Sequence, residues 1–289
     1  MRHIIPISGK DSLANALLTT THWPRDDYEF VFNDVAAELP ETYEWLDKVE
    51  KITGWTILRI GKSLPDLIQK QGILPSSQTR FCTTRCKIRP LKRLTAEATA
   101  TIYYGLRADE PDRSGYQEDR KGVVIIPRYP LRELGVGLKL VYQLLQAQGL
   151  LPPTFFWPTI YEPVQRHLRG FNWESQLTTH EFNVLFAGRS RSNCFFCFFQ
   201  RQYEWIWLSE AHPDLFQKAV DLEANTGAEG YTWCQGYSLT DLLNQKHTII
   251  DRRVVEVCKA ITQRLQGSLF ADDADTVMGS TSCGLFCGK

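Results

Sequence analysis

Short apolar runs and helix-like segments alternate along the first part of the chain, and this alternation restricts the possible folds more than any other feature. The runs that predict strands cover residues 3–7, 27–34, 55–60 and 98–106. A helix is expected to open near Leu13, and residues 40–54 form an amphipathic pattern ending at Gly54, a common helix-ending residue. Strands alternating with helices predict an α/β fold with a doubly wound, mostly parallel sheet.

Polar, charged loops follow three of the expected strands. These loops are residues 8–12, 33–42 and 105–113. Ligands of doubly wound sheets bind beyond the carboxyl ends of the strands, where such loops gather. The sequence therefore predicts a ligand site at this edge of the sheet.

The pattern changes from about residue 135 onward and becomes mainly helical. We expect an α/β domain over residues 1–135 and a helical, cysteine-containing region over residues 136–270. Residues 271–289 form a tail of small, polar and glycine residues, a composition typical of mobile chain ends.

Charge and apolar content exclude several classes of protein. The chain has 33 basic and 33 acidic residues, so it lacks the broad basic surface of many nucleic-acid-binding proteins. Any contact with DNA is expected through a local patch or a partner protein. The sequence shows neither a signal peptide nor a membrane-spanning run, which predicts a cytoplasmic protein without membrane contact. Its eight cysteines are then expected to be reduced, and clustered ones indicate metal binding or catalysis.

The loop from Ser8 to Ser12 predicts phosphate binding. Gly9 lets the backbone approach a phosphate closely, and the N-terminus of the following helix favours an anion. Lys10 adds a positive charge, the Ser8 and Ser12 hydroxyls add donors, and Asp11 completes the loop. The alternative is a plain turn in which Asp11 or Ser12 caps the helix. The strand–loop–helix setting favours phosphate.

Motifs in the same order along the chain resemble those of one family. The loop is similar to SGGKDS of the PP-loop ATP pyrophosphatases, with one glycine fewer, and later segments are similar to the phosphoadenylyl-sulfate (PAPS) reductase branch. Those segments are Phe32-Asn33-Asp34 with Glu38–Thr42, Arg80-Phe81-Cys82, Lys87–Leu91, Gly105–Glu110 with Arg113, and Tyr129-Pro130-Leu131.

The resemblance implies an ATP site with Mg²⁺ in residues 1–135. The implied nucleotide-binding residues are Ser8, Gly9, Lys10, Asp11, Ser12, Asp34, Glu38, Gly105 and Arg107. The implied catalytic residues are Lys10, Asp11, Arg107, Arg113 and, in the tail, Cys283. Their chemistry agrees, because arginines bind phosphate or sulfate in a bidentate manner and a carboxylate such as Asp34 can bind ribose or Mg²⁺. For each residue taken alone, a surface ion pair is the alternative.

Four cysteines in two close pairs predict a metal site. Cys82 and Cys86 form the early pair and Cys194 and Cys197 the late pair. Four thiolates can hold either a 4Fe–4S cluster or a zinc ion, and spacing does not separate the two. Four phenylalanines around the late pair favour a cluster, because an apolar shell excludes water: Phe195, Phe196, Phe198 and Phe199. The resemblance also implies a cluster, although its cluster-bearing members carry adjacent cysteines where this chain has Cys82 and Cys86.

The remaining cysteines fall into two groups. Cys234 and Cys258 stand alone in apolar surroundings and are expected to be small buried side chains. Cys283 and Cys287 lie in the tail sequence SCGLFC, which resembles the ECGLH ending of the reductases with Glu and His replaced. We expect Cys283 to carry a sulfane sulfur, and the alternative is a frayed end with incidental cysteines.

These features together favour an ATP pyrophosphatase, yielding AMP and pyrophosphate, coupled to sulfur transfer. The segment around the late cysteines resembles the DNA phosphorothioation sulfurtransferases of the DndC or SspD type, which implies a DNA backbone phosphate as acceptor and a cysteine desulfurase as sulfur donor. PAPS or adenylyl-sulfate reduction, thiolation of a tRNA base, and a cluster-bearing scaffold that only binds nucleotide remain alternatives.

Overall fold

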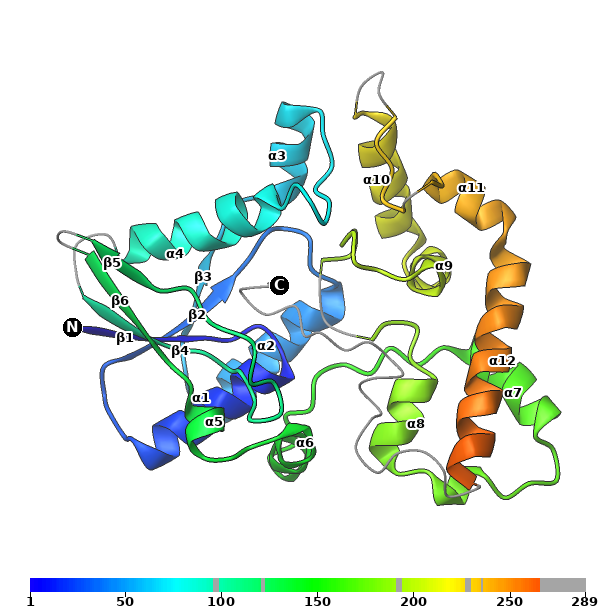
Figure 1. Cartoon of the computed structure of the whole chain (residues 1–289), viewed down its shortest axis with the longest axis horizontal. Coiled ribbons are helices and arrows are strands. Elements are labelled where there is room, and N and C mark those ends of the chain that lie inside the picture. Colours follow the sequence, from blue (N-terminus) through cyan, green and yellow to red (C-terminus); the bar gives the residue numbers. More distant parts are fainter. Residues whose placement is uncertain (96–98, 121–122, 191–193, 227–229, 235, 266–289) are drawn as a thin grey trace.

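A six-stranded sheet forms the centre of the N-terminal half in the computed structural model, which describes residues 1–95, 99–120, 123–190, 194–226, 230–234 and 236–265 (Figure 1). Its strands run in the order β3-β2-β1-β4-β6-β5. They are β1 (Arg2–Pro6), β2 (Tyr28–Asn33), β3 (Ile57–Ile60), β4 (Ala100–Tyr103), β5 (Glu118–Arg120) and β6 (Val123–Arg128). All neighbours pair in parallel except β5 and β6, which are antiparallel. The expected α/β fold with a mostly parallel sheet is confirmed.

Alternating side chains give the sheet two buried faces. Ile5 and Phe30 belong to a core shared with α1 (Lys10–His22), α2 (Pro40–Thr53) and α6 (Leu138–Ala147). Ile4 and Val31 belong to a second core, on which Leu91 of α4 (Arg89–Leu94) packs. Burial on both faces is expected of parallel strands and explains their nearly continuous apolar sequences. The amphipathic pattern of α2 is confirmed, and Gly54 ends that helix with φ 72°.

Short helices complete the α/β half. They are α3 (Leu64–Gln71), a π-helical segment η1 (Cys82–Ile88) and α5 (Pro130–Glu133). The segment η1 continues directly into α4, so both early cysteines stand on one helical unit. Strands β5 and β6 extend the sheet beyond the four strands that the sequence analysis predicts.

The C-terminal half is helical. It contains α7 (Pro158–His167), a 3₁₀ turn η2 (Glu174–Gln176), α8 (Thr179–Leu185), α9 (Gln202–Ala211), α10 (Pro213–Ala224), α11 (Leu239–Asn244) and α12 (Lys246–Leu265). The long helix α12 lies against α7 and α9 (Figure 1). Among the described helices, none combines the length and the apolar character that crossing a membrane would take.

The two halves share one apolar core. Val35 and Leu39, in the loop after β2, and Leu64 of α3 pack with buried residues of the helical half. The Phe195 amide donates to the Ala37 carbonyl over 2.7 Å, which joins the halves through their backbones. The domain boundaries near residues 135 and 270 stay predictions. By its packing, α6 belongs to the same core as α1 and α2.

Candidate active site

The loops after β1 and β4 meet at the point where the strand order reverses. Strand β1 lies between β2 and β4, so the chain runs to one side of β1 for β2 and β3 and to the other side for β4. Doubly wound sheets bind ligands beyond the strand ends at such a switch point. A Cβ atom on Gly105, which follows β4, would lie 2.6 Å from the Cα of Ser12. Only glycine permits this approach, so Gly105 brings the second loop onto the first.

Hydrogen bonds within the Ser8–Ser12 loop fix its shape. The Ser12 hydroxyl accepts from the amides of Ser8 and Gly9 over 2.8 and 3.0 Å and donates to the Gly9 carbonyl over 2.9 Å. In this structure the Ser12 hydroxyl and both amides therefore serve the loop itself. Gly9 is extended, with φ 169°, and a Cβ added there would meet no protein atom within 4 Å. The space beside Gly9 is open for a ligand.

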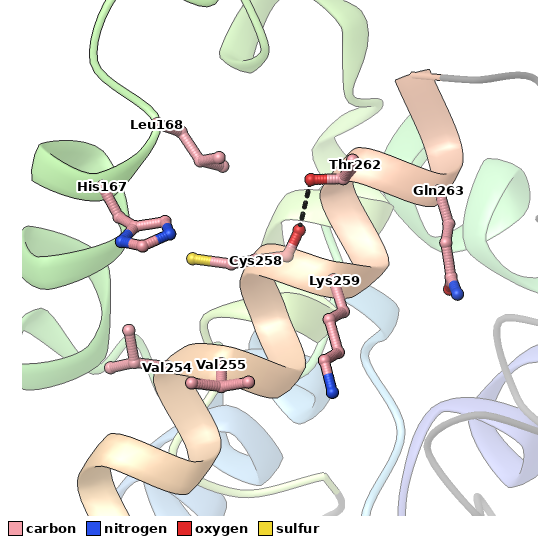
Figure 2. A pocket seen from close by; sticks show the side chains of 8 residues that line it. All are labelled: His167, Leu168, Val254, Val255, Cys258, Lys259, Thr262 and Gln263. Atoms are coloured by element: carbon pink, nitrogen blue, oxygen red, sulfur yellow. Dashed lines mark hydrogen bonds between the residues drawn. The ribbon is translucent and has the colours of Figure 1, made fainter.

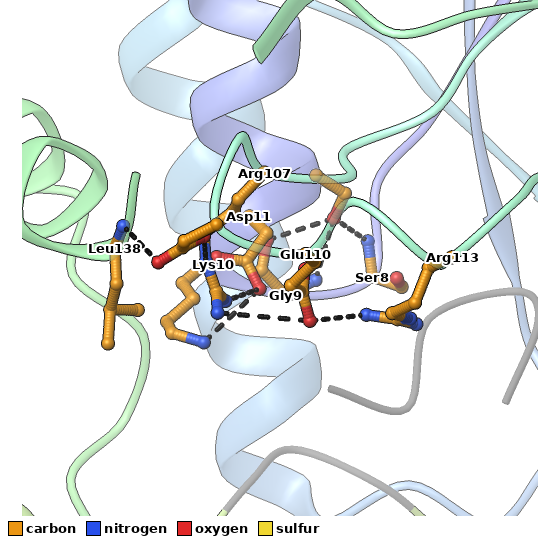
Figure 3. A network of polar contacts seen from close by, with 10 residues as sticks. Ser8, Gly9, Lys10, Asp11, Arg107, Glu110, Arg113 and Leu138 are labelled. Carbon is orange, nitrogen blue, oxygen red and sulfur yellow. Dashed lines mark hydrogen bonds and ion pairs between the residues drawn. The ribbon is translucent and has the colours of Figure 1, made fainter. Parts of the chain in front are cut away.

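A chain of ion pairs joins the two loops (Figure 3). One carboxylate oxygen of Asp11, Oδ2, forms ion pairs with Lys10 at 3.2 Å and with Arg107 at 3.1 Å. Arg107 also contacts Asp109 at 2.8 Å and Glu110 at 3.8 Å, and Glu110 receives Arg113 at 2.7 Å. The structure therefore brings together four of the predicted catalytic residues. It also holds their three cations against three carboxylates, rather than turned toward open space.

Opposite charges favour the ionised forms of Arg107 and Asp109. Burial by itself lowers the pKa of Arg107, but Asp11 and Glu110 outweigh burial and leave that pKa well above its ordinary value. Burial raises the pKa of Asp109, whereas the hydrogen bond from Arg107 lowers it, and the net shift is downward. The side chain of Arg107 is only 4% exposed, so its charge acts in a medium that screens it weakly.

Several buried polar atoms at this edge have no hydrogen-bond partner. They are Oδ1 of Asp11, Oε2 of Glu110 and both amide atoms of Asn33, at the end of β2. Buried polar groups are nearly always paired, so unpaired ones clustered at one edge indicate a ligand that supplies the missing partners. A nucleotide with Mg²⁺ offers both donors and a cation. Among the described residues no three acidic, His or Cys side chains could hold a metal ion by themselves.

Asp34 lies at the same edge and is held in place by a glycine that the sequence analysis misses. A Cβ atom on Gly61 would lie 1.8 Å from the Asp34 carbonyl oxygen, and Gly61 has φ 148°. One carboxylate oxygen of Asp34 accepts from the Ala36 amide over 2.7 Å and from the Tyr43 hydroxyl over 2.9 Å. The only sequence signal for Gly61 is its position directly after a strand.

Arg132 is a second residue that the sequence analysis misses. Its guanidinium donates to the carbonyl oxygens of Arg107, Glu110 and Arg113, so one side chain holds the whole loop after β4. Arg132 follows the Tyr129-Pro130-Leu131 motif. The motif therefore positions Arg132, whose hydrogen bonds hold the loop that carries Arg107 and Arg113.

The four paired cysteines gather where the helical half meets the loop after β2. Cys86 and Cys194 are buried in the shared core, and Cys82 and Cys197 pack against it. Burial raises the pKa of Cys82 and Cys194, and the nearby Cys197 thiol adds to the rise in both. Burial, with a further contribution from the charge of the nearby Cys82 thiol, raises the pKa of Cys86 to about 11. Phe195 and Phe196 are buried beside the late pair, while Phe198 and Phe199 are partly exposed.

Charged side chains surround this cysteine group. Glu38 accepts from the Cys194 thiol over 3.8 Å, so the structure places Glu38 at the cysteines. Burial lowers the pKa of Lys87, but Cys194 and Glu38 outweigh it and raise that pKa above its usual value. Arg189, 2% exposed, donates to the Cys194 carbonyl over 3.0 Å. The sequence analysis assigns no role to Lys87 or Arg189, yet both place positive charge beside the thiols.

The geometry of the cysteine group bears on which metal suits it. No three Cys, His, Asp or Glu side chains among the described residues lie close enough to ligate one ion. A tetrahedral zinc site needs its four sulfurs about 2.3 Å from one centre, whereas a cubane cluster separates its thiolates by a cage of irons. The buried phenylalanines and the positive charges of Lys87 and Arg189 beside the thiols would suit an anionic group.

The other cysteines lie apart from this group. Cys234 and Cys258 are 9% and 8% exposed, as expected for buried side chains. Cys258 lines a hollow of about 370 Å³ between α12 and the end of α7, opposite His167 (Figure 2). Cys283 and Cys287 lie outside the described residues.

Comparison with known proteins is informative for the first part of the chain. Residues 2–120 match the family model of the Phosphoadenosine phosphosulfate reductase domain. That stretch carries the Ser8–Ser12 loop, Asp34, the early cysteine pair and the loop with Arg107 and Arg113. The match therefore supports the superfamily assignment that the sequence motifs indicate.

Similar proteins and structures add less. The Uncharacterized proteins MJ0973 and MJ0066 of Methanocaldococcus jannaschii are 26% and 25% identical over 74% and 83% of this chain. The chain spans less than half of their length, 45% and 44% respectively. A crystal structure of phosphoadenylyl-sulfate (PAPS) reductase from Candida auris, in a phosphate complex, covers 53% of this chain and 74% of its own, with 17% identity and a TM-score of 0.36.

Proposed function

We propose that this chain cleaves ATP to AMP and pyrophosphate and uses the reaction to thiolate a DNA backbone phosphate. The observation that carries the proposal is the junction of the two loops at the switch point. There the Asp11–Arg107 pair is buried, Lys10 and Arg113 belong to the same network of ion pairs, and the space beside Gly9 is open. Unpaired atoms of Asp11 and Asn33 at the same edge offer further contacts to a bound nucleotide.

The residues would divide the work as follows. Arg107 and Arg113 would exchange part of their pairing with carboxylates for phosphate oxygens, and Lys10 would stabilise the departing pyrophosphate. Asp11 would hold Mg²⁺ through its unpaired oxygen, and Asp34 would bind the ribose. Arg132 would fix the loop and take no part in the chemistry. A 4Fe–4S cluster on Cys82, Cys86, Cys194 and Cys197 would supply electron-transfer chemistry when bound.

The proposed reaction balances in two steps. A DNA phosphate oxygen attacks the α-phosphorus of ATP, pyrophosphate leaves, and the DNA phosphate becomes a mixed anhydride with AMP. A protein persulfide, charged by a cysteine desulfurase, then attacks the DNA phosphorus through its outer sulfur, and AMP leaves. A second thiol attacks the inner sulfur, which releases the phosphorothioate and oxidises the two cysteines to a disulfide. An external thiol must reduce that disulfide before the next turnover.

The products of ATP cleavage test the proposal directly. Anaerobically purified protein, duplex DNA, a cysteine desulfurase with cysteine, a thiol reductant and Mg²⁺-ATP should give AMP, pyrophosphate and sulfur in the DNA. Appearance of ADP and free phosphate would refute the reaction class. Bound but uncleaved ATP under these conditions would favour a nucleotide-binding scaffold.

Sulfonucleotide reduction is the second candidate, and the description of the matching family favours it. In that reaction a thiol would attack the sulfur of phosphoadenylyl sulfate and release the nucleotide, with sulfite leaving after reduction by thioredoxin. ATP would not be consumed. Sulfite release from phosphoadenylyl sulfate with thioredoxin, in the absence of ATP cleavage, would identify this activity in place of the first.

A further inference from the structure

Positive charge is concentrated in one short stretch of a chain whose net charge is zero. Residues 62–95 contain eight Lys and Arg residues and one Asp, so this stretch carries a formal charge of +7 while the whole chain carries none. The remainder is therefore acidic overall and repels polyanions. A polyanionic partner has this stretch as its natural point of contact.

Three arginines within the stretch form an exposed row. Arg85, Arg89 and Arg93 follow one another at intervals of four residues along η1 and α4, and all three are exposed. Side chains four residues apart share one face of a helix. Leu91 between them is fully buried against the sheet, so the arginine row lies on the outer side of α4.

The arginine row is not neutralised by neighbouring acids. Lys92, next to it, pairs with Glu118 at 3.2 Å, but Arg85, Arg89 and Arg93 form no ion pair with any described residue. An uncompensated row of guanidinium groups suits an extended series of phosphates better than it suits one anion, because each arginine can bind a separate phosphate.

The row also leads toward the cysteine group. Arg85 directly precedes Cys86 in η1. Arg80 stands before Cys82, with its guanidinium 5.5 Å from the centre of the Phe199 ring. Two buried nitrogens of Arg80, Nε and Nη2, have no hydrogen-bond partner, which adds a second sign of a missing anion.

We propose that Arg85, Arg89 and Arg93 bind the backbone phosphates of duplex DNA, with Arg80, beside the early cysteine pair, as a further phosphate contact. The choice of DNA as the polyanion rests on the proposed function. The binding surface itself rests on the charge, exposure and lack of pairing of the arginines. Because backbone contacts do not read bases, binding is expected to be independent of sequence.

The test is the salt dependence of duplex binding, measured by fluorescence anisotropy without ATP. Each phosphate contact contributes about 0.9 to the slope of log affinity against log salt. Changing Arg85, Arg89 and Arg93 to Gln together should therefore reduce the slope by about 2.7 and weaken binding at least tenfold near 150 mM salt. The matched control changes Arg166, Arg169 and Arg252, three exposed arginines of the helical half, and should leave the slope unchanged.

Further measurements separate folding and function from binding. If the triple variant loses its cluster or fails to fold, Arg89→Gln with Arg93→Gln, both on α4, should still lower the slope by about 1.8. Equal slopes for wild type and double variant would overturn the proposal, as would arginine-dependent binding of tRNA or of the desulfurase without binding of duplex. Arginine-dependent duplex binding without AMP release would support this surface while refuting the proposed function. AMP release by the wild type, together with equal slopes for wild type and variant, would support the proposed function and refute this surface.

Discussion

Gly105 and Ser12 are in close contact, such that a Cβ atom on Gly105 would lie 2.6 Å from the Ser12 Cα. Gly9, three residues before Ser12, has open space instead of a neighbour. The two glycines therefore have different purposes. Gly105 allows two loops of the protein to touch, and Gly9 leaves room for something that is not protein.

This contrast gives a prediction from two matched substitutions. Gly105→Ala must push the loop after β4 away from Ser12, so it should lower the melting temperature and abolish ATP cleavage. Gly9→Ala meets no protein atom and has an extended backbone that alanine accepts, so the melting temperature should stay within about 1 °C of wild type. ATP binding should nevertheless weaken at least tenfold. Thermal unfolding measures the melting temperature and nucleotide titration measures the ATP affinity. If Gly9→Ala binds ATP as tightly as wild type, the open space beside Gly9 is not the phosphate site.

Lys10 is predicted to act on the phosphates even though it rests on Asp11 at 3.2 Å. A charge-assisted contact is worth about 1.5–3 kcal/mol, so Lys10→Ala should lower AMP formation at least tenfold. Lys48→Ala, at an exposed position on α2, is the control and should keep wild-type turnover. If Lys10→Ala turns over as wild type does, the ion pair with Asp11 is structural.

The cysteine group is predicted to carry iron. Protein purified without air should be brown, with about four irons and four sulfides per chain. Cys194→Ser and Cys197→Ser should each bleach it, because each removes a thiolate from the group. Cys234→Ser and Cys258→Ser change buried cysteines outside the group and should leave the iron content intact. One zinc and no iron in protein never exposed to air would contradict the cluster.

Sequence reasoning succeeds where neighbouring residues decide the outcome. Short apolar runs specify β1 to β4, and Gly54 specifies the end of α2, because both signals are local. The same reasoning identifies the residues that follow the strands. It misses Gly61 and Arg132, because their importance comes from contacts with Asp34 and with the loop after β4 that sequence order does not reveal. Glu38 meets Cys194 across 156 positions, so its place at the cysteines follows only from how the two halves pack.

The buried histidine near the start of the chain predicts a pH dependence of stability. Burial lowers the pKa of His3, with a further contribution from the charge of Arg25. The unfolded chain therefore binds a proton at a higher pH than the folded protein does. Stability from the neutral ring is complete above the ordinary pKa of about 6.5, and it is lost as the pH falls from that value through the lowered pKa.

Melting temperatures between pH 8 and pH 5 check this expectation. His3→Gln should unfold at a lower temperature at pH 8, since it loses the 2.9 Å contact with the Tyr103 hydroxyl, but should show a flatter decline toward pH 5. His247→Gln, at an exposed position, should keep the wild-type pH profile. A decline equally steep in His3→Gln would assign the acid sensitivity to other groups.

Cys283 and Cys287, which lie outside the described residues, are predicted to deliver the sulfur. A persulfide must reach an activated phosphate, and thiol exchange requires direct access to the sulfur. The described cysteines are poorly suited, because burial raises the pKa of Cys82, Cys86 and Cys194 and keeps these thiols protonated when no metal binds them.

Truncation before Ser282 should therefore leave cluster content and ATP binding intact while abolishing sulfur incorporation into DNA. Cys283→Ser should reproduce the loss, whereas Cys287→Ser should allow persulfide to form on Cys283 and block its release. Full incorporation by the truncated chain, with desulfurase and cysteine supplied, would show that sulfur reaches the acceptor by another route, with the cluster as the rival carrier.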